Sequence, residues 1–263
     1  RRLPDGRWIL VNEHRTKDGG TVILHTDISD LKDREAALAR SNRELETFAS
    51  IASHDLQEPL RKIDAFGDRL KRRYYDQLGD DGRMYVERMQ SAVGRMRSLI
   101  EDLLDYSRVT TKAKPFQSVP LDEVLEEVKS DLQVAIENSN ATFRDTSLPV
   151  IDADRTQMRQ LLQNIIANAL KFRKPDVPPM IVIDGRTIDG ARNPNGSDGG
   201  RRLRLTIADN GIGFEMKYAE RIFGIFQRLH TRAEYDGTGV GLATCRKIAE
   251  RHKGTITVVS EPD

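Results

Sequence analysis

The sequence predicts a multidomain chain of class α plus α/β, with a short β segment, then a long helical hairpin, then a mixed α/β domain. One observation is a change of hydrophobic period near Ile28, from two residues to about 3.5. A second is the appearance of short strands between amphipathic helices beyond Pro120. The third is composition. Of 263 residues, 32% are charged and 38% hydrophobic, which favours long exposed helices over one deep core.

The composition also excludes several classes of protein. The 42 Lys and Arg residues against 41 Asp and Glu leave a net charge of +1, so no global basic field exists to attract nucleic acid. No stretch approaches the roughly 18 apolar residues of a membrane span. The chain opens on Arg1 without a signal peptide, and its single cysteine, Cys245, cannot form an internal disulfide. We therefore expect a cytoplasmic chain, cut from something longer.

Residues 1–27 alternate as β-strands do. Trp8 and Leu10 share one face of a first strand, and Ile23 belongs to a second strand. The run Asp18-Gly19-Gly20 between them is a hairpin signal. Because two strands alone are marginally stable in water, we expect this hairpin to be the end of a larger sheet.

A heptad repeat begins at Ile28. Its d positions are Leu31, Leu38, Leu45 and Ala52. The register continues to Leu70, which is longer than an ordinary globular helix. We therefore predict a signalling coiled coil over residues 28–46 that enters a helical bundle.

A second helix is predicted after a loop at 79–82. Its apolar positions are spaced alternately by four and three residues: Tyr85, Met89, Ala92, Met96, Leu99, Leu103 and Tyr106. Residues 47–112 therefore form an antiparallel hairpin, and two helices cannot bury both apolar faces alone. The sequence predicts a dimeric four-helix bundle, followed by a linker at 113–120.

The region 121–263 has an α/β pattern. The expected helices are 121–136, 155–173 with Asp154 as N-cap, and 241–253 ending at Gly254. The expected strands are 149–151, 180–183, 202–208 and 255–260, with a Gly/Asn/Pro/Ser loop at 189–200.

His54 is the first candidate for chemistry. It falls at the solvent-exposed f position of the heptad, with Asp55 beside it and Pro59 five residues later. An exposed imidazole is an available nucleophile, and a neighbouring carboxylate can fix its tautomer or accept its proton. For His54 alone, the simpler alternative is a solvated surface histidine.

The helix at 155–173 carries a polar stripe. Asn164, Asn168 and Lys171 are spaced i, i+4 and i+7 and so share one face. An amide oxygen can bind Mg²⁺, and an ammonium group can meet phosphate oxygens. The alternative is an ordinary amphipathic helix.

Two glycine clusters complete the set of motifs. Asp209 ends a strand and is followed by Gly211 and Gly213, a turn where backbone can approach a ligand closely. Gly237–Gly241 runs directly into a helix, whose N-terminus favours phosphate. Either cluster alone could be a plain flexible loop.

The order of these motifs resembles that of the sensor histidine kinases of two-component signalling. The matching segments are residues 53–60 around His54, Asn164–Phe172, Asp209–Gly213, Phe223 with Phe226, and Gly237–Gly241. The resemblance covers about residues 28–260 and looks most like the phytochrome-type subgroup. Residues 1–27 look like the last strands of a PAS domain.

The resemblance implies an α/β sandwich that binds ATP in the region 121–263. Asp209 would bind the adenine amino group, and Asn168 would hold Mg²⁺ with Asn164 and Lys171 near the phosphates. Residues 224–240 would form a mobile lid over the nucleotide. The other ATP-binding positions that it implies are Gly211, Gly213, Phe223, Phe226, Gly237, Thr238, Gly239, Gly241 and Leu242.

The resemblance also implies phosphotransfer. His54 would attack the γ-phosphate, with Asp55 as base or orienting group, and the phosphoryl group would pass to an aspartate in the receiver domain of a response regulator. A homodimer through residues 28–110 and an upstream sensory domain are expected. Glu58 stands where many relatives carry Thr or Asn linked to phosphatase action, and relatives continue past residue 263 through a closing strand.

Two other functions fit part of the pattern. One is an ATPase or serine kinase of the same ATP-binding superfamily, against which His54, Asp55 and Pro59 on a heptad hairpin argue. The other is a catalytically silent dimer that relays signals through its helices. The presence of Asn168 and Asp209 together with both glycine motifs argues against that alternative.

Overall fold

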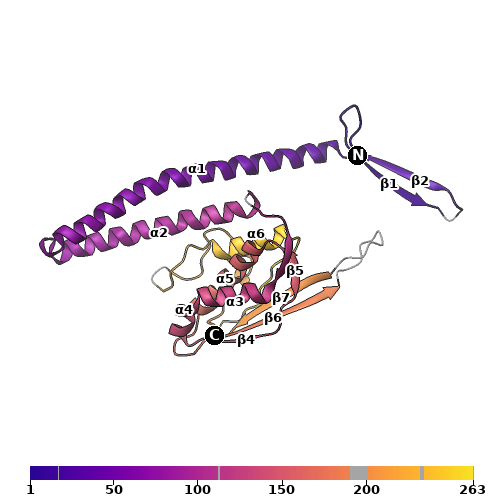
Figure 1. Ribbon diagram of the computed structural model, residues 1–263. Coiled ribbons are helices and arrows are strands. Elements are labelled where there is room, and N and C mark those ends of the chain that lie inside the picture. The colour runs from indigo at the N-terminus through magenta and orange to yellow at the C-terminus, as the bar shows by residue number, and fades with distance from the viewer. Residues whose placement is uncertain (17, 112, 190–200, 232–233, 263) are drawn as a thin grey trace. The chain divides into compact units, whose positions relative to one another are not determined.

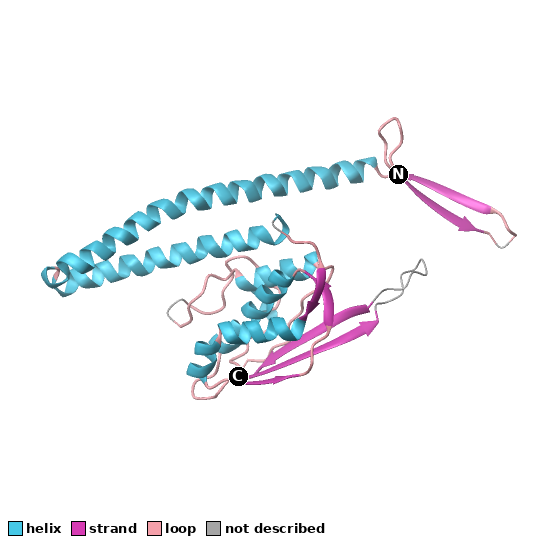
Figure 2. Ribbon diagram, viewed as in Figure 1, coloured by secondary structure: helices cyan, strands magenta, loops and turns pink. Residues whose placement is uncertain are grey.

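The computed structural model describes residues 1–16, 18–111, 113–189, 201–231 and 234–262 (Figures 1 and 2). For residues 38, 39, 41–52, 54 and 189 it describes the backbone alone. The chain divides into two units, 1–52 and 53–263. Most of the loop expected at 189–200 lies outside the described residues.

The first unit begins with the predicted β-hairpin. Strands β1 (Ile9–Arg15) and β2 (Thr21–Asp27) pair antiparallel along their whole length. The turn contains Gly19 at φ 86°, a conformation that favours glycine. Ser29, the first residue of the following helix, accepts a hydrogen bond at Oγ from the Trp8 N–H at 2.9 Å, so the hairpin is tied to the start of that helix.

Helix α1 (Ser29–Tyr74) is one continuous helix of 46 residues, as the heptad register predicts, and it contains Pro59. A 3₁₀ turn at Tyr75–Gln77 connects it to α2 (Gly79–Thr111). The prediction of a loop at 79–82 is therefore wrong, because these residues form the first turn of α2. Asp80 and Asp81 lie where the positive end of the helix dipole favours acidic side chains.

Helix α2 packs on α1 with a face one position away from the predicted stripe. Its buried apolar residues Val93, Ile100 and Leu104 form a cluster with Leu60 of α1. The predicted stripe is only partly covered: Met89 lies against Gly67 of α1, whereas Tyr85 is 64% exposed. The most buried face of α2 is therefore displaced by one position from the predicted stripe, and part of that stripe stays exposed.

The α1 segment within the second unit also has an uncovered apolar face. Its exposed large apolar residues are Leu56, Ile63, Phe66 and Leu70, and on α2 Met96 is exposed in addition to Tyr85. Apolar side chains that repeat at this spacing along a hairpin are typical of helices that associate with further helices. The monomer thus keeps the unburied surface that a four-helix bundle requires.

Beyond α2 the chain forms the α/β fold that the sequence predicts (Figure 1). Its strands are β3 (Gln117–Pro120), β4 (Thr142–Asp145), β5 (Val150–Ala153), β6 (Met180–Asp189) and β7 (Arg201–Asp209). Its helices are α3 (Leu121–Asp131), α4 (Gln133–Ser139), α5 (Arg155–Lys171) and α6 (Gly241–Arg251), with 3₁₀ turns at Met216–Tyr218 and Arg221–Phe223. The strands form two sheets, ordered β3-β5 and β4-β6-β7, and β4 runs parallel to β6.

The core of this domain lies between the helices and the sheets. Leu125 of α3, Leu162 and Ile166 of α5, Ile181 of β6 and Ile248 of α6 are fully or almost fully buried in one cluster. Val109, in the last turn of α2, belongs to the same cluster, so the end of the hairpin is anchored in the α/β core.

Three local predictions for this domain need correction. The expected linker 113–120 contains strand β3, which pairs with β5 through Val119 opposite Ile151. The expected single helix 121–136 breaks at Leu132 into α3 and α4. Residues 255–260 are not a strand in the structure, because no strand among the described residues pairs with them. The short strand β4 was not expected, since its four residues carry little apolar alternation.

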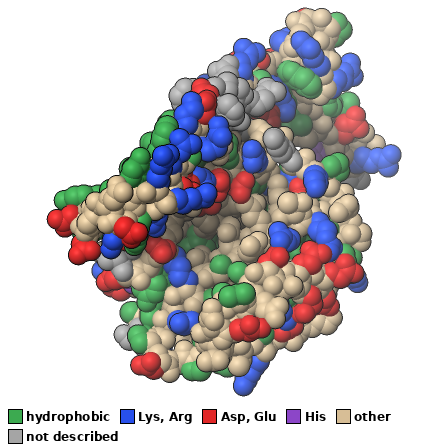
Figure 3. Space-filling model, turned by 60° about the vertical axis from the view of Figure 1, so that its left-hand side comes forward, with side chains coloured by type: hydrophobic (Ala, Val, Ile, Leu, Met, Phe, Trp, Pro, Cys, Tyr) green, Lys and Arg blue, Asp and Glu red, His purple; other side chains and the backbone are tan. Residues whose placement is uncertain are grey.

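Charges of both signs are interspersed over the face of the molecule in Figure 3. Among the described residues many charges are paired, as in Arg155 with Glu127 at 2.7 Å and Lys129 with Asp145 at 3.1 Å. Opposite charges thus often lie next to one another.

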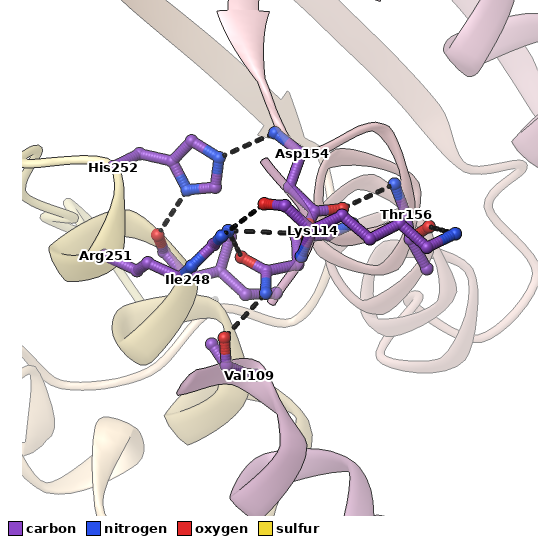
Figure 4. Close-up of polar contacts among 8 residues, drawn as sticks. Val109, Lys114, Asp154, Thr156, Ile248, Arg251 and His252 are labelled. Carbon is purple, nitrogen blue, oxygen red and sulfur yellow. Dashed lines mark hydrogen bonds and ion pairs between the residues drawn. The ribbon is translucent and has the colours of Figure 1, made fainter. Parts of the chain in front are cut away.

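The passage from the hairpin into the α/β domain is held by a hydrogen-bond network around the buried side chain of Asp154 (Figure 4). Asp154, which is 2% exposed, caps α5 by accepting from the backbone N–H groups of Thr156 and Gln157, as its predicted role requires. It also accepts from the Lys114 N–H at 2.9 Å and pairs with Arg251 at 3.3 Å. One carboxylate thus joins the connecting segment, α5 and the end of α6.

The imidazole of His252 completes this network in its neutral form. Its Nε2 accepts from the Asp154 N–H at 3.1 Å, and its Nδ1 faces the Ile248 carbonyl oxygen at 2.8 Å. The ring also stacks on Phe116 with the two centroids 4.5 Å apart. Burial lowers the pKa of His252, against the opposing effect of the Ile248 hydrogen bond.

We expect the stability of this region to fall in mild acid. Because the His252 pKa is lowered on folding, the unfolded chain binds more protons between that pKa and about 6.5. The contribution of His252 to the free energy of unfolding should therefore be fully present above about pH 6.5. The free energy of unfolding should decrease as the pH falls below that value. Denaturant titrations between pH 7.5 and 5.5 measure this. His252→Gln should flatten the profile, whereas His14→Gln, on exposed β1, should leave it unchanged. Equal slopes in both variants would contradict the assignment.

Candidate functional site

The polar stripe of α5 faces the start of α6. Asn164 donates from its side-chain amide to the Gly241 carbonyl oxygen at 3.3 Å. Asn168, one turn later, is half-buried, and Lys171 is the last residue of the helix. The i, i+4, i+7 spacing thus aligns one amide with the second glycine cluster and leads to a cation at the end of the same face.

The Asp209–Gly213 turn lies against the end of α5. The Ile212 N–H donates to the Phe172 carbonyl oxygen at 2.9 Å. A Cβ at Gly211 would lie 2.6 Å from that same oxygen and 2.6 Å from Asp209 Oδ1, so no larger residue fits without a shift. Asp209 Oδ1 accepts from the Gly211 N–H at 2.8 Å. Among the described residues Oδ2 makes no hydrogen bond.

Gly213 has a second requirement for glycine. Its φ is 60°, and a Cβ there would collide with the carbonyl oxygen of Glu261 near the end of the chain. The segment after α6 therefore packs against the turn, and the Phe214 N–H donates to Ser260 Oγ at 3.0 Å. Gly211 and Gly213 are therefore both required by close backbone neighbours. The segment after α6 takes part in this packing although residues 255–260 form no strand.

The second glycine cluster leads into α6 and meets Lys171. A Cβ at Gly237, where φ is 138°, would lie 2.9 Å from Lys171 Nζ. Gly239 has φ 77° and faces the backbone of Phe226 and Gln227. Gly241 is the first residue of α6, and Leu242 behind it is half-buried. The loop thus presents backbone beside an ammonium group and at the positive end of a helix dipole.

Arg228 belongs to this site, although the sequence analysis did not select it. Its guanidinium donates to the carbonyl oxygens of Thr231, Tyr235 and Gly237. Burial lowers the pKa of Lys171, and the nearby positive charge of Arg228 lowers it further. Two cations held near one another are favourable for binding a polyanion. In the sequence, the signal that could have pointed to Arg228 was its position two residues after Phe226.

Phe172 also belongs to the site. It packs against Tyr235 and His230 with ring centroids 5.0 and 5.8 Å apart. The ammonium of Lys171 lies 4.2 Å from the centre of the Phe172 ring. This aromatic group holds the loop after Arg228 against the end of α5.

Phe223 and Phe226 lie in different environments. Phe223 is buried, and the Arg246 guanidinium of α6 lies 4.4 Å from the centre of its ring. Phe226 is 52% exposed and has φ 62°, in the left-handed region that is costly for a bulky residue. Phe223 therefore anchors the region before the glycine loop, whereas Phe226 is available to a ligand or another segment.

His54 and Asp55 lie in α1, in the part that belongs to the second unit. The Asp55 side chain is exposed, and the His54 side chain is outside the described residues. The residues on α5, after β7 and at the start of α6 come together through the contacts given above, whereas no contact joins the described part of His54 to them. Thr238 is different, because its hydroxyl donates to Asp102 of α2.

Two family models match this chain. Residues 44–112 match the His Kinase A (phospho-acceptor) domain, and residues 153–263 match the histidine kinase-, DNA gyrase B- and HSP90-like ATPase. The helical hairpin and the α/β domain described above occupy these two regions. The chain belongs to the sensor histidine kinases.

Curated relatives point to the same family. Cyanobacterial phytochrome A of Nostoc sp. is 42% identical over 224 residues, which are 85% of this chain and 28% of that protein. Phytochrome-like protein Cph1 of Synechocystis sp. is 40% identical over 86% of this chain and 28% of its own length. This chain thus spans between a quarter and a third of these two relatives.

Solved structures share the fold. Full-length ShkA in complex with AMPPNP superposes with a TM-score of 0.60 at 24% identity, over 82% of this chain and 43% of ShkA. Histidine kinase ThkA in complex with response regulator protein TrrA gives a TM-score of 0.51 at 21% identity, over 94% of this chain and 68% of that one.

Neither a resident metal cluster nor a membrane helix is found in the described part of the chain. No group of three or more His, Cys, Asp or Glu side chains there could hold a metal ion. The helices of the described residues are too polar to cross a bilayer.

The glycine requirement at residue 211 can be tested against a neutral position. Gly211→Ala should destabilise the α/β domain and distort the turn at Asp209, because the added methyl meets backbone at 2.6 Å. Gly94→Ala is the matched control. Gly94 lies inside α2 with open space around its Cβ position, so alanine there should stabilise the helix by about 0.5–1 kcal/mol. Thermal denaturation measures both changes, and a stable Gly211→Ala would disprove the steric argument.

Cys245 should be unreactive in the folded protein. It is fully buried in α6, and burial raises the pKa of its thiol to about 12. The thiolate, which is the reactive form, is therefore scarce at neutral pH. A chromogenic disulfide reagent should label no thiol until denaturant unfolds the α/β domain. Rapid labelling of the native chain would contradict the burial of Cys245 in the folded protein.

Proposed function

We propose that this chain is the kinase core of a sensor histidine kinase. It binds Mg-ATP in the α/β domain, transfers the γ-phosphoryl group to His54, and passes it on to an aspartate of a response-regulator receiver domain. The observation that carries this proposal is the meeting of Asn164, Lys171 and the Gly237–Gly241 loop at the start of α6. Membership of the family supports the same reading.

The turn at Asp209 is suited to the adenine ring. Its Oδ1 is occupied by the Gly211 N–H, while Oδ2 is available to accept from an exocyclic amino group. Gly211 and Gly213 keep the adjacent surface free of side chains, so a flat base can lie close to the backbone. We therefore assign adenine recognition to Asp209, Gly211 and Gly213.

The phosphates are assigned to the other end of the site. Lys171 and Arg228 supply positive charge, and Gly237, Thr238, Gly239 and Gly241 supply backbone close to the N-terminus of α6. Asn168 lies on the same face of α5, where its amide oxygen would help to hold Mg²⁺. When bound, Mg²⁺ neutralises phosphate charge. Phe226 and Leu242 line the approach, and Phe223 supports it from the core.

The chemical step transfers one phosphoryl group. An imidazole nitrogen of His54 attacks the γ-phosphorus as the bond to the β–γ bridging oxygen breaks, and the electron pair of that bond leaves with ADP. The imidazole proton is lost to solvent or to Asp55, which also orients the ring. The N–P bond later breaks as a carboxylate oxygen of the regulator attacks phosphorus. Such transfers depend mainly on positioning and charge neutralisation.

The domain organisation is part of the proposal. Residues 28–46 form the signalling coil, 47–112 the phosphotransfer hairpin, and 121–263 the catalytic domain. The exposed apolar residues Leu56, Phe66 and Tyr85 support a homodimer through the hairpin. Residues 1–27 are the last strands of a PAS domain, which transmits a signal from an upstream sensory domain in the cytoplasm. The exposed apolar side chains of β1 and β2, among them Val22 and Leu24, fit a sheet that continues.

Labelling with γ-³²P-ATP tests the kinase reaction. The chain should acquire a label that is stable in alkali and lost in acid, as a phosphoramidate requires. His54→Gln should abolish this label while Mg-ATP binding is retained. Asn168→Ala should lower the labelling rate by roughly 100-fold or more, because a group that stabilises phosphate charge is removed.

The outcomes separate the alternative functions. An acid-stable label, or a label that survives His54→Gln, would indicate a serine kinase or a different phosphoacceptor. ATP hydrolysis without any label would indicate an ATPase. Absence of Mg-ATP binding would indicate a silent relay protein. His14→Gln is the matched control. It makes the same replacement at a histidine outside the hairpin, in strand β1, and this variant should be labelled normally.

A further inference from the structure

The sheet β4-β6-β7 has one face in the core and one face turned away from it. Phe143, Leu205 and Ile207 pack against the core cluster, to which the buried Ile181 and Ile183 belong. Because side chains alternate along a strand, the residues between them point to the opposite face. That outer face carries Thr142 and Arg144 of β4, Met180, Val182, Asp184, Arg186 and Ile188 of β6, and Arg202, Arg204, Thr206 and Ala208 of β7.

Arginine dominates the charge of this outer face. Four exposed arginines lie on it: Arg144, Arg186, Arg202 and Arg204. The one acidic residue among the outer positions just given is Asp184, and it is already engaged. Its Oδ2 lies 2.7 Å from Arg186 Nε, and its Oδ1 accepts from the Thr146 hydroxyl at 3.2 Å. Within the described part of the chain, the other three arginines have no acidic partner.

Two of these arginines face each other across the sheet. Arg186 and Arg204 are direct partners in the antiparallel register of β6 and β7. Like charges directly opposite one another destabilise a sheet. Arg202 is opposite Ile188, which offers no compensating charge. The cluster therefore lowers the stability of the sheet, as residues that are retained for binding commonly do.

The chemistry of the outer face fits carboxylates of another protein. A guanidinium presents its N–H groups in a planar fork that matches a carboxylate, and arginine is enriched in protein interfaces. Val182, Ile188 and Ala208 lie among the charged side chains, so the face also offers apolar area.

Nucleic acid fits the outer face less well than protein does. Proteins that bind single strands offer aromatic side chains on which bases stack, and the outer positions of β4, β6 and β7 given above include none. The net charge of +1 supplies no wide positive field either. The arginines thus form a local cationic patch on a chain that is almost neutral, which favours a protein partner with a matching acidic patch.

We propose that the outer face of the β4-β6-β7 sheet is a docking surface for a protein partner that carries clustered Asp and Glu side chains. Arg202 and Arg204 bind its carboxylates, and Arg144 and Arg186 extend the contact across the sheet. The surface lies toward the start of β7, whereas Asp209 ends that strand. This inference goes beyond the proposed function and does not depend on it.

Binding of a fluorescent oligo-glutamate peptide to the full chain tests the docking surface. Arg202→Gln with Arg204→Gln removes two charges and keeps two long polar side chains. We expect this double variant to bind the peptide roughly 10-fold or more weakly than the unmodified chain, because charge-assisted hydrogen bonds are lost. Arg69→Gln with Arg72→Gln is the matched control. It removes two exposed arginines that line an open pocket on α1, and it should bind the peptide normally.

Thermal unfolding gives an independent measurement. Arg204→Gln relieves the like-charge pair with Arg186, so its unfolding midpoint at low salt should lie above that of the unmodified chain. Arg202→Gln is the control here, because this residue is opposite Ile188, and it should change the midpoint less. The difference between these two variants should shrink as added salt screens the pair.

Each outcome supports or overturns the docking surface. Weaker peptide binding by the Arg202/Arg204 double variant alone, together with a higher midpoint for Arg204→Gln, supports it. Equal losses in both double variants would indicate a non-specific attraction and overturn it, as would absence of peptide binding by the unmodified chain. A lower midpoint for Arg204→Gln would show that this arginine serves the fold, and would overturn it too. Tighter binding of a single-stranded oligonucleotide of the same charge, lost in the Arg202/Arg204 variant, would overturn it in favour of nucleic acid.

Discussion

The carboxylate of Asp154 is the interaction on which the arrangement of the catalytic region depends. It caps α5, accepts from the backbone of Lys114 just after the hairpin, and pairs with Arg251 at the end of α6. A buried carboxylate needs such partners, because an unpaired charge in a protein interior is strongly destabilising. The same group therefore sets where α5 begins, where α6 ends and where the chain enters the domain.

The candidate nucleotide site follows from this arrangement. With α5 fixed at its N-terminus, Asn164 meets Gly241 and the far end of the helix meets the Asp209–Gly213 turn. The site is thus formed by segments that are distant in sequence and that share no local pattern. Its two glycine clusters are needed for different reasons. Gly211 leaves room for the backbone at Phe172, whereas in the second cluster Gly237 and Gly239 have positive φ and Gly237 lies beside Lys171.

The hairpin takes part in this site as well as carrying His54. Val109 anchors α2 in the α/β core, and Asp102 reaches the glycine loop two turns earlier. The hairpin is therefore connected to the α/β domain at two points of the same helix, one apolar and one polar.

The sequence by itself determined the class of the fold, the long helix through Leu70, the Asp154 cap and the order of the motifs, because period, capping and glycine patterns are local properties. The predictions of a loop at 79–82 and of a strand at 255–260 were wrong, and the prediction of a linker at 113–120 missed strand β3. Helix starts and strand pairing depend on partners that are distant in the sequence. The buried stripe of α2 and the roles of Phe172 and Arg228 were decided by tertiary contacts alone. So was the contact of Asp102 with Thr238, because no local pattern records which of many exposed carboxylates will meet a loop 136 residues away.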